Sequence, residues 1–223
     1  VVAHPDDEVL GCGGLIDKLT KLKKKVRVVF IAEGSSCRYT EDFNRDTINK
    51  KISQRSNFAK QALKILNVKD FIFYNLKCGS LNAYPLIKIN KIIENEISKF
   101  SPDTIITHNS DDCNNDHNII NKSVMIASRP SSFSSIKNVL TFEVQSSTEW
   151  NFENNFKPNI FFDINDNINN KIKAFKMYYK TEGKPFPFPR SSKGLKVLAN
   201  YRGMQIGVEY AEAYKLIRSY QNW

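Results

Sequence analysis

The stretch Val1–Glu8 reads VVAHPDDE, and it places one imidazole and three carboxyl groups directly after a short apolar run. That run, Val1–Ala3, is typical of a strand that is buried on both faces of a sheet. Ligands bind at the carboxyl ends of the strands in open α/β sheets, and His4 and the acids follow such an end. The stretch therefore predicts the first strand of a parallel sheet and the position of a functional site.

The rest of the chain alternates between similar runs and helical stripes. Further β-branched or aromatic runs cover residues 26–31, 71–73, 104–107 and 139–142. Between them, apolar residues recur at the spacing of amphipathic helices: Leu15, Leu19 and Leu22; Ile52, Ala59, Leu63 and Leu66; Leu86, Ile89, Ile93 and Ile97. Strands that alternate with helices predict right-handed crossovers and an α/β fold, in which a Rossmann-like, mostly parallel sheet carries helices on both faces.

The last third of the chain predicts a looser order. We expect a strand at residues 160–163, followed by a helix that carries Ile168, Ile172 and Phe175. A Pro/Phe segment at residues 185–189 then leads to a last helix through Tyr210, Tyr214 and Ile217. No linker is long enough to divide the chain. We therefore treat residues 1–223 as one domain.

Composition and charge are those of a globular protein. The 223 residues are 41% hydrophobic, which is enough for a full core. No run of 18 apolar residues and no signal-peptide pattern occurs, so we expect no membrane span. Because the chain does not open on Met, we also expect native residues before Val1. The net charge of +10 comes from 33 basic and 23 acidic residues, and the basic ones are dispersed without interleaved aromatic residues. We therefore predict no nucleic-acid partner, and the sequence leaves the oligomeric state open.

The cysteines and the glycines following the first cluster both have structural interpretations. No C-x-x-C pair occurs among Cys12, Cys37, Cys78 and Cys113. A domain of this size does not need disulfide bonds, so we predict a reducing, cytoplasmic environment. Gly11-Cys12-Gly13-Gly14 does not match a nucleotide-binding loop, because the third glycine of G-x-G-x-x-G would fall at Ile16. These glycines are interpreted as sites of close packing between helix and sheet.

A second polar cluster follows the run at 104–107. It reads HNSDDCNNDH over residues 108–117 and opens the next predicted helix. All three histidines of the chain, His4, His108 and His117, fall in the two clusters. If the strands before them are neighbours, the clusters face each other at the carboxyl edge of the sheet. Two histidines and one carboxylate that leave a coordination position open are typical of catalytic zinc, so a divalent metal site is predicted.

Spacing within the first cluster separates the roles of its acids. Pro5 stiffens the turn, and the residue three positions after His4 returns to the same side, so Asp7 can share the metal ion with His4. Asp6 is then free to accept a proton as a general base. Glu8 is expected to cap the helix or support the site. The alternative, a polar turn that only caps a helix, would not explain the second cluster.

Both clusters resemble those of one family, the N-acetylglucosaminyl-phosphatidylinositol de-N-acetylases, also called PIG-L or LmbE-like proteins. The likeness rests on AHPDDE at residues 3–8 and on Asp116-His117. Weaker similarity extends over nearly the whole chain, at Arg55 and at residues 142–150, 189–191, 202–203 and 211–212. The resemblance implies that His4, Asp7 and His117 hold zinc or another divalent metal, and that Asp6 is the general base.

The chain also departs from the family's pattern. Many members carry a histidine where this chain has Asn114; His108 is the predicted catalytic replacement, with a neutral histidine bonded to the backbone as the alternative. Cys78-Gly79-Ser80 stands where members commonly have charged residues that contact substrate. Candidate substrate-binding residues are Arg55, Asn114, Arg190 and Arg202; for each of the three arginines, a surface or interface ion pair is the alternative.

The family reaction is hydrolysis of the acetamide of an amino sugar. It implies that this chain is an N-deacetylase with a small amino-sugar substrate, for which a nucleotide- or lipid-linked sugar of surface-glycan biosynthesis is a candidate. A non-catalytic carbohydrate-binding or scaffold protein on the same fold is the alternative. Asp6 argues against it, because a binding module needs no free carboxylate beside its metal.

Overall fold

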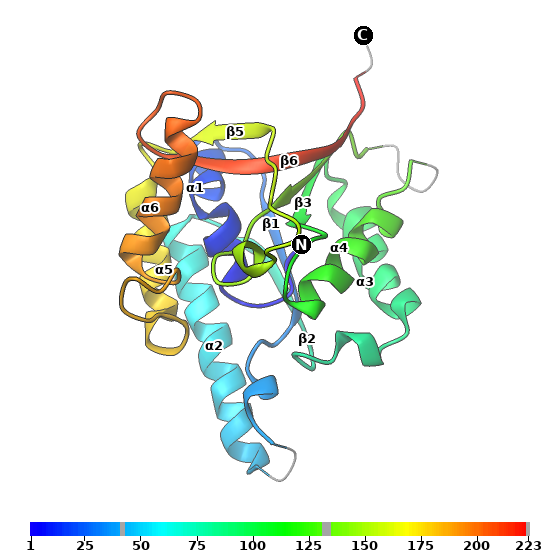
Figure 1. Ribbon diagram of the computed structural model, residues 1–223. Helices are drawn as coiled ribbons and strands as arrows, with labels where there is room; N and C mark the ends of the chain where they lie inside the picture. The colour runs from blue at the N-terminus through cyan, green and yellow to red at the C-terminus, as the bar shows by residue number, and fades with distance from the viewer. Residues whose placement is uncertain (41–42, 131–134, 222–223) are drawn as a thin grey trace.

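The computed structural model describes residues 1–40, 43–130 and 135–221, which include six α-helices and six strands (Figure 1). The helices are α1 (Asp7–Lys21), α2 (Arg45–Ile65), α3 (Leu86–Phe100), α4 (Asn115–Ala127), α5 (Ile168–Glu182) and α6 (Ser192–Met204). The strands are β1 (Arg27–Ala32), β2 (Asp70–Leu76), β3 (Thr104–His108), β4 (Asn138–Phe142), β5 (Ile160–Asp163) and β6 (Ala211–Ser219). Three short 3-10 turns are η1 (Ser36–Arg38), η2 (Leu81–Ala83) and η3 (Thr148–Trp150).

The strands form two hydrogen-bonded groups that the start of the chain links together. β1 pairs with β2 in parallel, and β3 pairs with β4 in parallel. Val2 makes a single parallel bridge to Phe30 of β1, and the backbone nitrogen of Val1 donates to the Ile106 carbonyl of β3 at 2.9 Å. The strand expected at residues 1–3 is thus one bridge, and it lies between β1 and β3. Both polar clusters consequently end at the same edge of the sheet.

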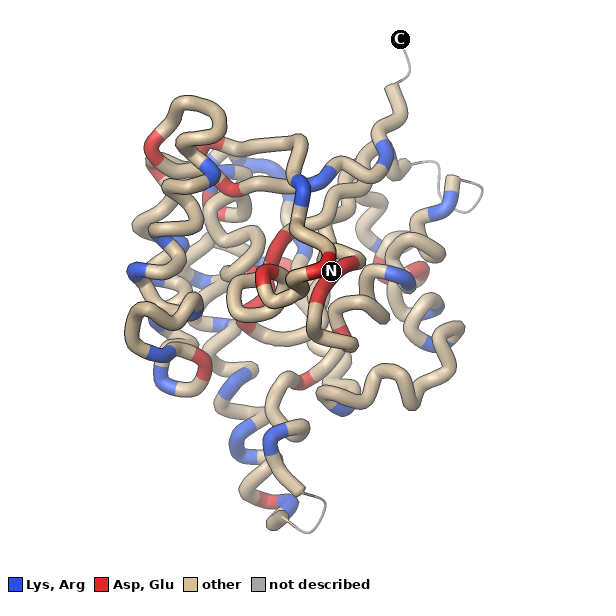
Figure 2. Tube along the Cα trace, viewed as in Figure 1, with Lys and Arg blue, Asp and Glu red and all other residues tan. Residues whose placement is uncertain are grey.

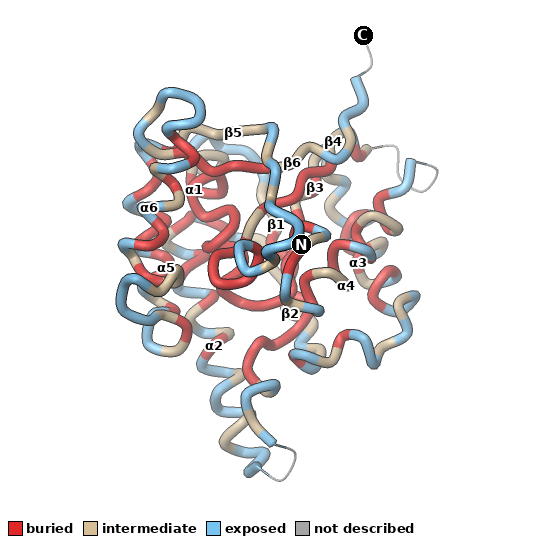
Figure 3. The backbone as a smooth tube through the Cα atoms, in the orientation of Figure 1, coloured by how far each residue is buried: buried red, intermediate tan, exposed pale blue. Residues whose placement is uncertain are grey.

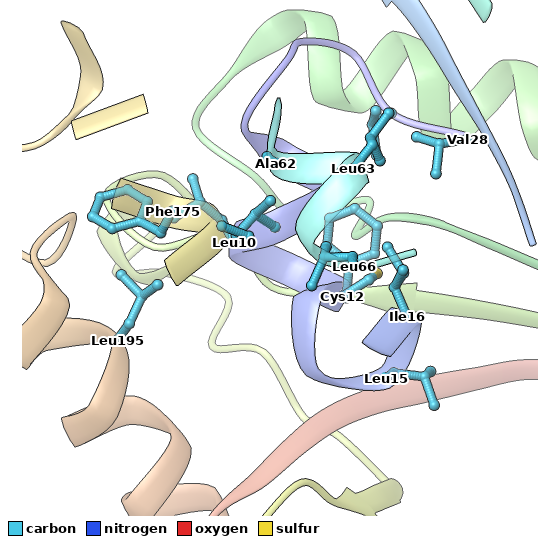
Figure 4. Packing of buried hydrophobic residues seen from close by; sticks show 14 of the residues in the cluster. Leu10, Cys12, Leu15, Ile16, Val28, Ala62, Leu63, Leu66, Phe175 and Leu195 are labelled. Atoms are coloured by element: carbon cyan, nitrogen blue, oxygen red, sulfur yellow. The ribbon is translucent and has the colours of Figure 1, made fainter. Parts of the chain in front are cut away.

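Helices cover both faces of this sheet. Figure 1 shows α1, α2, α5 and α6 on one side and α3 and α4 on the other. Two clusters of buried apolar residues correspond to the two faces, one built from α1, α2 and α5, the other from α3 and α4. Figure 4 shows the first cluster, with Leu10, Leu66 and Phe175 among its side chains. The predicted α/β fold with helices on both faces is confirmed.

The glycines of α1 permit the close packing that the sequence predicted. A Cβ at Gly11 would lie 2.2 Å from the ring of Phe142 in β4, and one at Gly14 would lie 2.8 Å from Ile164. Real side chains cannot approach so closely, so α1 could not take its place against the sheet with larger residues there. Figure 3 shows that most of α1 is buried as a result.

The predicted last helix is wrong. Residues 192–204 form α6, and Tyr214 and Ile217 lie in strand β6, which pairs antiparallel with β4 and β5. The first four residues of β6 are all buried, so the strand shows no alternation of apolar and polar residues. The aromatic residues stand at helical spacing with good helix formers between them, and this pattern gave a false signal. Pairing of β6 with β4 and β5 overrides the local preference for a helix.

Glu212 of β6 is a buried acid that binds the middle of α1. Its carboxylate accepts hydrogen bonds from the backbone N–H groups of Gly14 at 2.7 Å and Leu15 at 2.8 Å. The ammonium of Lys171 in α5 lies 2.6 Å from the same carboxylate and donates to the Leu10 carbonyl at 2.8 Å. These polar contacts join α1, α5 and β6 inside the core.

Glu212→Ala is expected to destabilise the fold by about 3–5 kcal/mol, because it leaves the buried Lys171 charge and two backbone N–H groups without their partner. Denaturant unfolding followed by circular dichroism measures this free energy. Glu153→Ala, at an exposed position, is the matched control and should change it by less than about 0.5 kcal/mol. Equal stabilities of the two variants would contradict the structural role of Glu212.

Charge is distributed unevenly over the fold. Figure 2 shows Asp and Glu gathered near the first residues of the chain, at the centre of the view, while Lys and Arg are spread over the outer helices. Within the described ranges, no helix combines the length and the apolar character needed to cross a bilayer. The two predicted clusters contribute five buried acids, Asp6, Asp7, Glu8, Asp112 and Asp116.

Candidate active site

The turn after the first strand holds Asp6 in an unusual backbone conformation. Asp6 is the N-cap of α1 and has φ 120° and ψ −30°, a region that non-glycine residues rarely occupy and that costs about 1–3 kcal/mol. Its N–H donates to the Glu8 carboxylate at 2.9 Å, and Glu8 also accepts the Tyr178 hydroxyl at 2.5 Å. Glu8 thus supports the turn, as the sequence suggested. The cost is offset by contacts that the surrounding fold imposes.

Three side chains from the two clusters converge beside this turn. One candidate ligand atom each from His4, Asp7 and His117 lies within 4.8 Å of the other two, and all three residues are buried. The Asp7 carboxylate is 3.4 Å from His4 Nδ1 and 3.4 Å from His117 Nε2. Both ring nitrogens of His117 are buried, and neither makes a hydrogen bond of good geometry among the described residues. A nitrogen of this kind, beside a carboxylate and a second imidazole, fits a divalent metal ion.

Two further carboxylates orient the candidate histidine ligands. His4 Nε2 lies 3.0 Å from Asp116 Oδ2, and His117 Nδ1 lies 3.2 Å from Asp112 Oδ2. Each contact turns the opposite ring nitrogen toward Asp7, which is how carboxylates commonly fix metal-binding histidines. Both acids lie within the second polar cluster, but this role was not predicted for them. The need of each ligand histidine for a carboxylate partner was the signal that could have found them.

The carboxylates around these histidines favour the binding of a cation. Burial disfavours the anion of Asp7, but the imidazoles of His117 and His108 outweigh it and hold the pKa of Asp7 well below its usual range. Burial also disfavours a charged His117, yet Asp7 and Asp112 raise its pKa to about 10. His117 therefore carries a proton when no metal is bound, and a metal ion would displace that proton.

Asp6 lies beside the candidate metal ligands within a cluster of arginines. Its Oδ1 is 3.1 Å from Arg55 and its Oδ2 is 3.0 Å from Arg190. Burial raises the pKa of Asp6 to about 6, although both guanidinium groups act to lower it. Glu182, at the end of α5, binds Arg55 at 3.0 Å and Arg38 at 2.6 Å. Sequence reasoning missed Glu182, because no local pattern marks an acid so far from the two clusters.

The structure places His108 against the backbone. Its Nε2 accepts the N–H of Ala3 at 2.8 Å, and its ring stacks on His117 with the centroids 3.9 Å apart. Burial and the neighbouring His117 hold the pKa of His108 well below its usual value. This arrangement resembles the alternative expectation, a neutral histidine bonded to the backbone. A direct catalytic role for His108 stays a prediction.

The four candidate substrate-binding residues occupy different surroundings. Asn114 caps α4, accepting the N–H of Asp116 at 2.9 Å. Arg55 is enclosed by its carboxylate and carbonyl partners, whereas the Arg190 side chain is 17% exposed and reaches Asp6 from the rim. Arg202 makes a two-pronged ion pair with Glu143, at 2.7 Å for each bond. The structure thus brings Arg55 and Arg190 to Asp6 and places Arg202 in a separate ion pair.

One protein family matches the chain. The profile described as GlcNAc-PI de-N-acetylase (PIG-L) matches residues 1–128. That stretch includes both polar clusters and Arg55. No curated protein matches the sequence significantly.

Solved structures share the fold over nearly the entire chain. The N,N'-diacetylchitobiose deacetylase of Pyrococcus horikoshii has TM-score 0.75 and 21% identity, covering 97% of this chain and 82% of that one. The 4-carboxy-2-hydroxymuconate hydratase GalB of Pseudomonas putida has TM-score 0.75 and 19% identity, covering 100% and 97%. The A40926 pseudoaglycone deacetylase Dbv21 has TM-score 0.73 and 16% identity, covering 99% and 98%. At such identities the likeness shows the fold alone.

Proposed function

Because the chain belongs to the GlcNAc-PI de-N-acetylase (PIG-L) family, we propose that it is a metal-dependent hydrolase that removes the acetyl group from an N-acetylated amino sugar. The observation that carries the proposal is the convergence of His4, Asp7 and His117 beside Asp6, with His117 Nε2 left without a partner. Two of the structural neighbours named above are deacetylases, which supports the same reaction. A small amino sugar acted on in the cytoplasm is the substrate class that we propose, with a nucleotide- or lipid-linked sugar of surface-glycan biosynthesis as a candidate.

The proposed cofactor is zinc, held by His4, Asp7 and His117. When bound, such an ion lowers the pKa of a water molecule toward neutrality and polarises the oxygen of the substrate carbonyl. The nitrogen and oxygen donors at these three positions suit zinc, and another divalent ion is the alternative. Asp112 and Asp116 keep the two imidazoles in the orientation that this set requires.

Asp6 is the residue that we propose moves the proton. Its carboxylate accepts a proton from the attacking water and returns it to the departing amine, so that the amine leaves without a negative charge. Arg55 and Arg190 hold both carboxylate oxygens, and their positive charge keeps Asp6 ionised near neutral pH despite its burial. Arg190 is also exposed enough to contact the substrate. The hydrogen bond from the Ala3 N–H to His108 Nε2 and the stacking of its ring on His117 support a positioning role for this histidine.

Incubation with a panel of N-acetylated sugars, free and linked to nucleotides, tests the reaction. Released acetate and the mass of the product are measured, with and without a chelator. Acetate release that the chelator abolishes supports the proposal. A gain of one water without acetate would assign a hydratase reaction instead, and binding without either change would assign the carbohydrate-binding alternative.

The pH dependence of kcat/KM is expected to show an acid limb near pH 6. Only the ionised form of Asp6 can accept a proton, so activity is complete above the pKa of Asp6, about 6, and falls as the pH drops below it. Arg190→Gln removes a positive charge from Asp6, which raises the pKa of Asp6 and should move the limb to higher pH. An acid limb at the same pH in both proteins would contradict this assignment.

Asp116→Asn and Asp112→Asn are each expected to weaken metal binding by roughly 10- to 100-fold, because a ligand histidine loses the anion that orients its ring. Competition with a chromophoric chelator measures the affinity. Asp111→Asn is the matched control, since Asp111 contacts Ser110 at 3.2 Å and lies next to Asp112 in the chain. If all three variants bind metal like the unaltered protein, the two carboxylates do not orient the ligands.

A further inference from the structure

Two cysteines that are distant in sequence meet at the rim of the candidate active site. The Sγ atoms of Cys37 and Cys78 lie 2.9 Å apart, although 41 positions separate them along the chain. Cys37 belongs to η1 after β1, and Cys78 follows β2. Because β1 and β2 are parallel neighbours, the segments that follow them emerge side by side. Neither thiol has a part in the proposed hydrolysis.

The approach of these segments is built into the backbone. Glu33 accepts the N–H of Ser35 at 2.6 Å and the N–H of Cys78 at 2.9 Å, so one carboxylate binds both segments. Gly79 has φ +69°, and a Cβ at that position would lie 2.8 Å from Cys37 Cβ. Glycine is therefore required there on two grounds, and it lets the two sulfur atoms come together.

The two thiols differ in accessibility. Cys37 is exposed, whereas Cys78 is only 5% exposed. A reagent in solution therefore reaches Cys37 first, and Cys78 is placed to react only with whatever Cys37 becomes. An exposed thiol with a buried resolving thiol in contact is the arrangement that favours an intramolecular disulfide over a lasting adduct.

We propose that Cys37 and Cys78 form a thiol–disulfide exchange site that low-molecular-weight disulfides such as glutathione disulfide oxidise. Cys37, as the thiolate, attacks one sulfur of the reagent, breaks its S–S bond, and releases one glutathione thiolate. Cys78, as the thiolate, then attacks Cys37 Sγ and displaces the second glutathione. Two protein thiols and one glutathione disulfide thus become one protein disulfide and two glutathione molecules, with the two protein protons taken up by the leaving thiolates.

The new bond would lie close to the metal-binding histidine. Cys78 precedes Gly79, whose N–H donates to Asp116 at 2.6 Å, and Asp116 contacts His4. One candidate ligand atom each from Cys78, His4 and Asp116 falls within 4.8 Å of the other two. The disulfide would therefore fasten the segment that supports Asp116. This inference does not depend on which reaction the site performs.

The protein as purified, without chelator, is incubated with glutathione disulfide, then alkylated, digested and analysed by mass spectrometry. Cys113→Ser serves as the background, because it removes the other exposed thiol. We expect a peptide linked through Cys37 and Cys78, and its loss on treatment with excess glutathione. A stable glutathione adduct at Cys37 in this background, or two thiols that stay reduced, would overturn the proposal.

Single variants test the order of the steps. Cys78→Ser should accumulate a glutathione adduct at Cys37, because nothing resolves it, while Cys37→Ala should leave Cys78 reduced. Replacing the exposed Cys37 leaves the core unchanged, so this variant stays informative if Cys78→Ser fails to fold. Oxidation should also raise the Tm by roughly 5–10 °C in the Cys113→Ser background and leave the Tm of Cys37→Ala unchanged. Equal adduct formation at Cys37 with and without Cys78 would exclude Cys78 as the resolving thiol.

Discussion

Purified His4→Ala protein is expected to contain almost no metal, whereas the unaltered protein should carry one divalent ion per chain. His4 offers Nδ1 to the proposed site. Without it, two of the three proposed ligands remain, Asp7 and His117. Two protein ligands do not hold zinc at ordinary concentrations of free metal. Elemental analysis of the purified proteins measures the metal content directly.

His108→Ala is the matched control for this prediction. His108 is equally buried and stacks on His117, and its Nε2 lies 3.5 Å from the Asp7 carboxylate, but that nitrogen already accepts the Ala3 N–H and is not free to bind an ion. It should therefore keep the metal, and circular dichroism should show that both variants are folded. Stoichiometric zinc in folded His4→Ala would remove His4 from the ligand set.

Asp6→Asn is expected to retain its metal and to lose deacetylase activity by roughly 10²- to 10⁴-fold, which corresponds to about 3–5 kcal/mol of activation free energy. Asparagine keeps the size of the side chain but cannot take a proton from water. The comparison requires the initial rate of acetate release together with the zinc content of the same preparations. A zinc-loaded variant within a few-fold of the unaltered protein would move the base to Glu8 or Asp116.

Glu182→Gln separates the loss of the base from damage to the arginine cluster. An asparagine amide can accept from only one of the two guanidinium groups that now bind Asp6, so Asp6→Asn also disturbs Arg55 and Arg190. Glu182 binds the same arginines, at 3.0 Å and 3.6 Å, and has no proton to move in the proposed mechanism. Glu182→Gln should therefore lower the stability of the fold about as much as Asp6→Asn does, but should lower the activity far less. Equal losses of activity would mean that the cluster, rather than the base, accounts for the effect.

The sequence predicted the strand ends and what gathers there, because His4, Asp7 and His117 stand at positions that a parallel sheet necessarily brings to one edge. The same logic does not reach Glu182, which arrives from the far end of α5 through the packing of α5 against α2. It also did not reach the contact of Cys37 with Cys78, since their proximity comes from the pairing of β1 with β2 rather than from spacing in the chain.

The local spacing of apolar residues was misleading in β6, where burial of successive residues removes the alternation that marks a strand. Tyr214 and Ile217 stand at helical spacing, yet they belong to a strand whose buried start includes the charged Glu212. A buried glutamate in that position makes sense only once α1 and Lys171 are seen beside it. Roles that depend on a partner from another part of the chain therefore lay beyond the sequence, while roles set by a strand end did not.

The bond between Glu212 and α1 also bears on the order in which the protein can be made. The helix that begins at Asp7 is synthesised among the first segments, but its backbone groups at Gly14 and Leu15 obtain their carboxylate partner some two hundred residues later. A ribosome-bound chain that has not yet released β6 would hold Asp7, one of the three proposed metal ligands, on a helix that lacks these two hydrogen bonds. The buried support of α1 can therefore form only after residue 212 has left the exit tunnel, and premature termination before that point would yield a chain that lacks it.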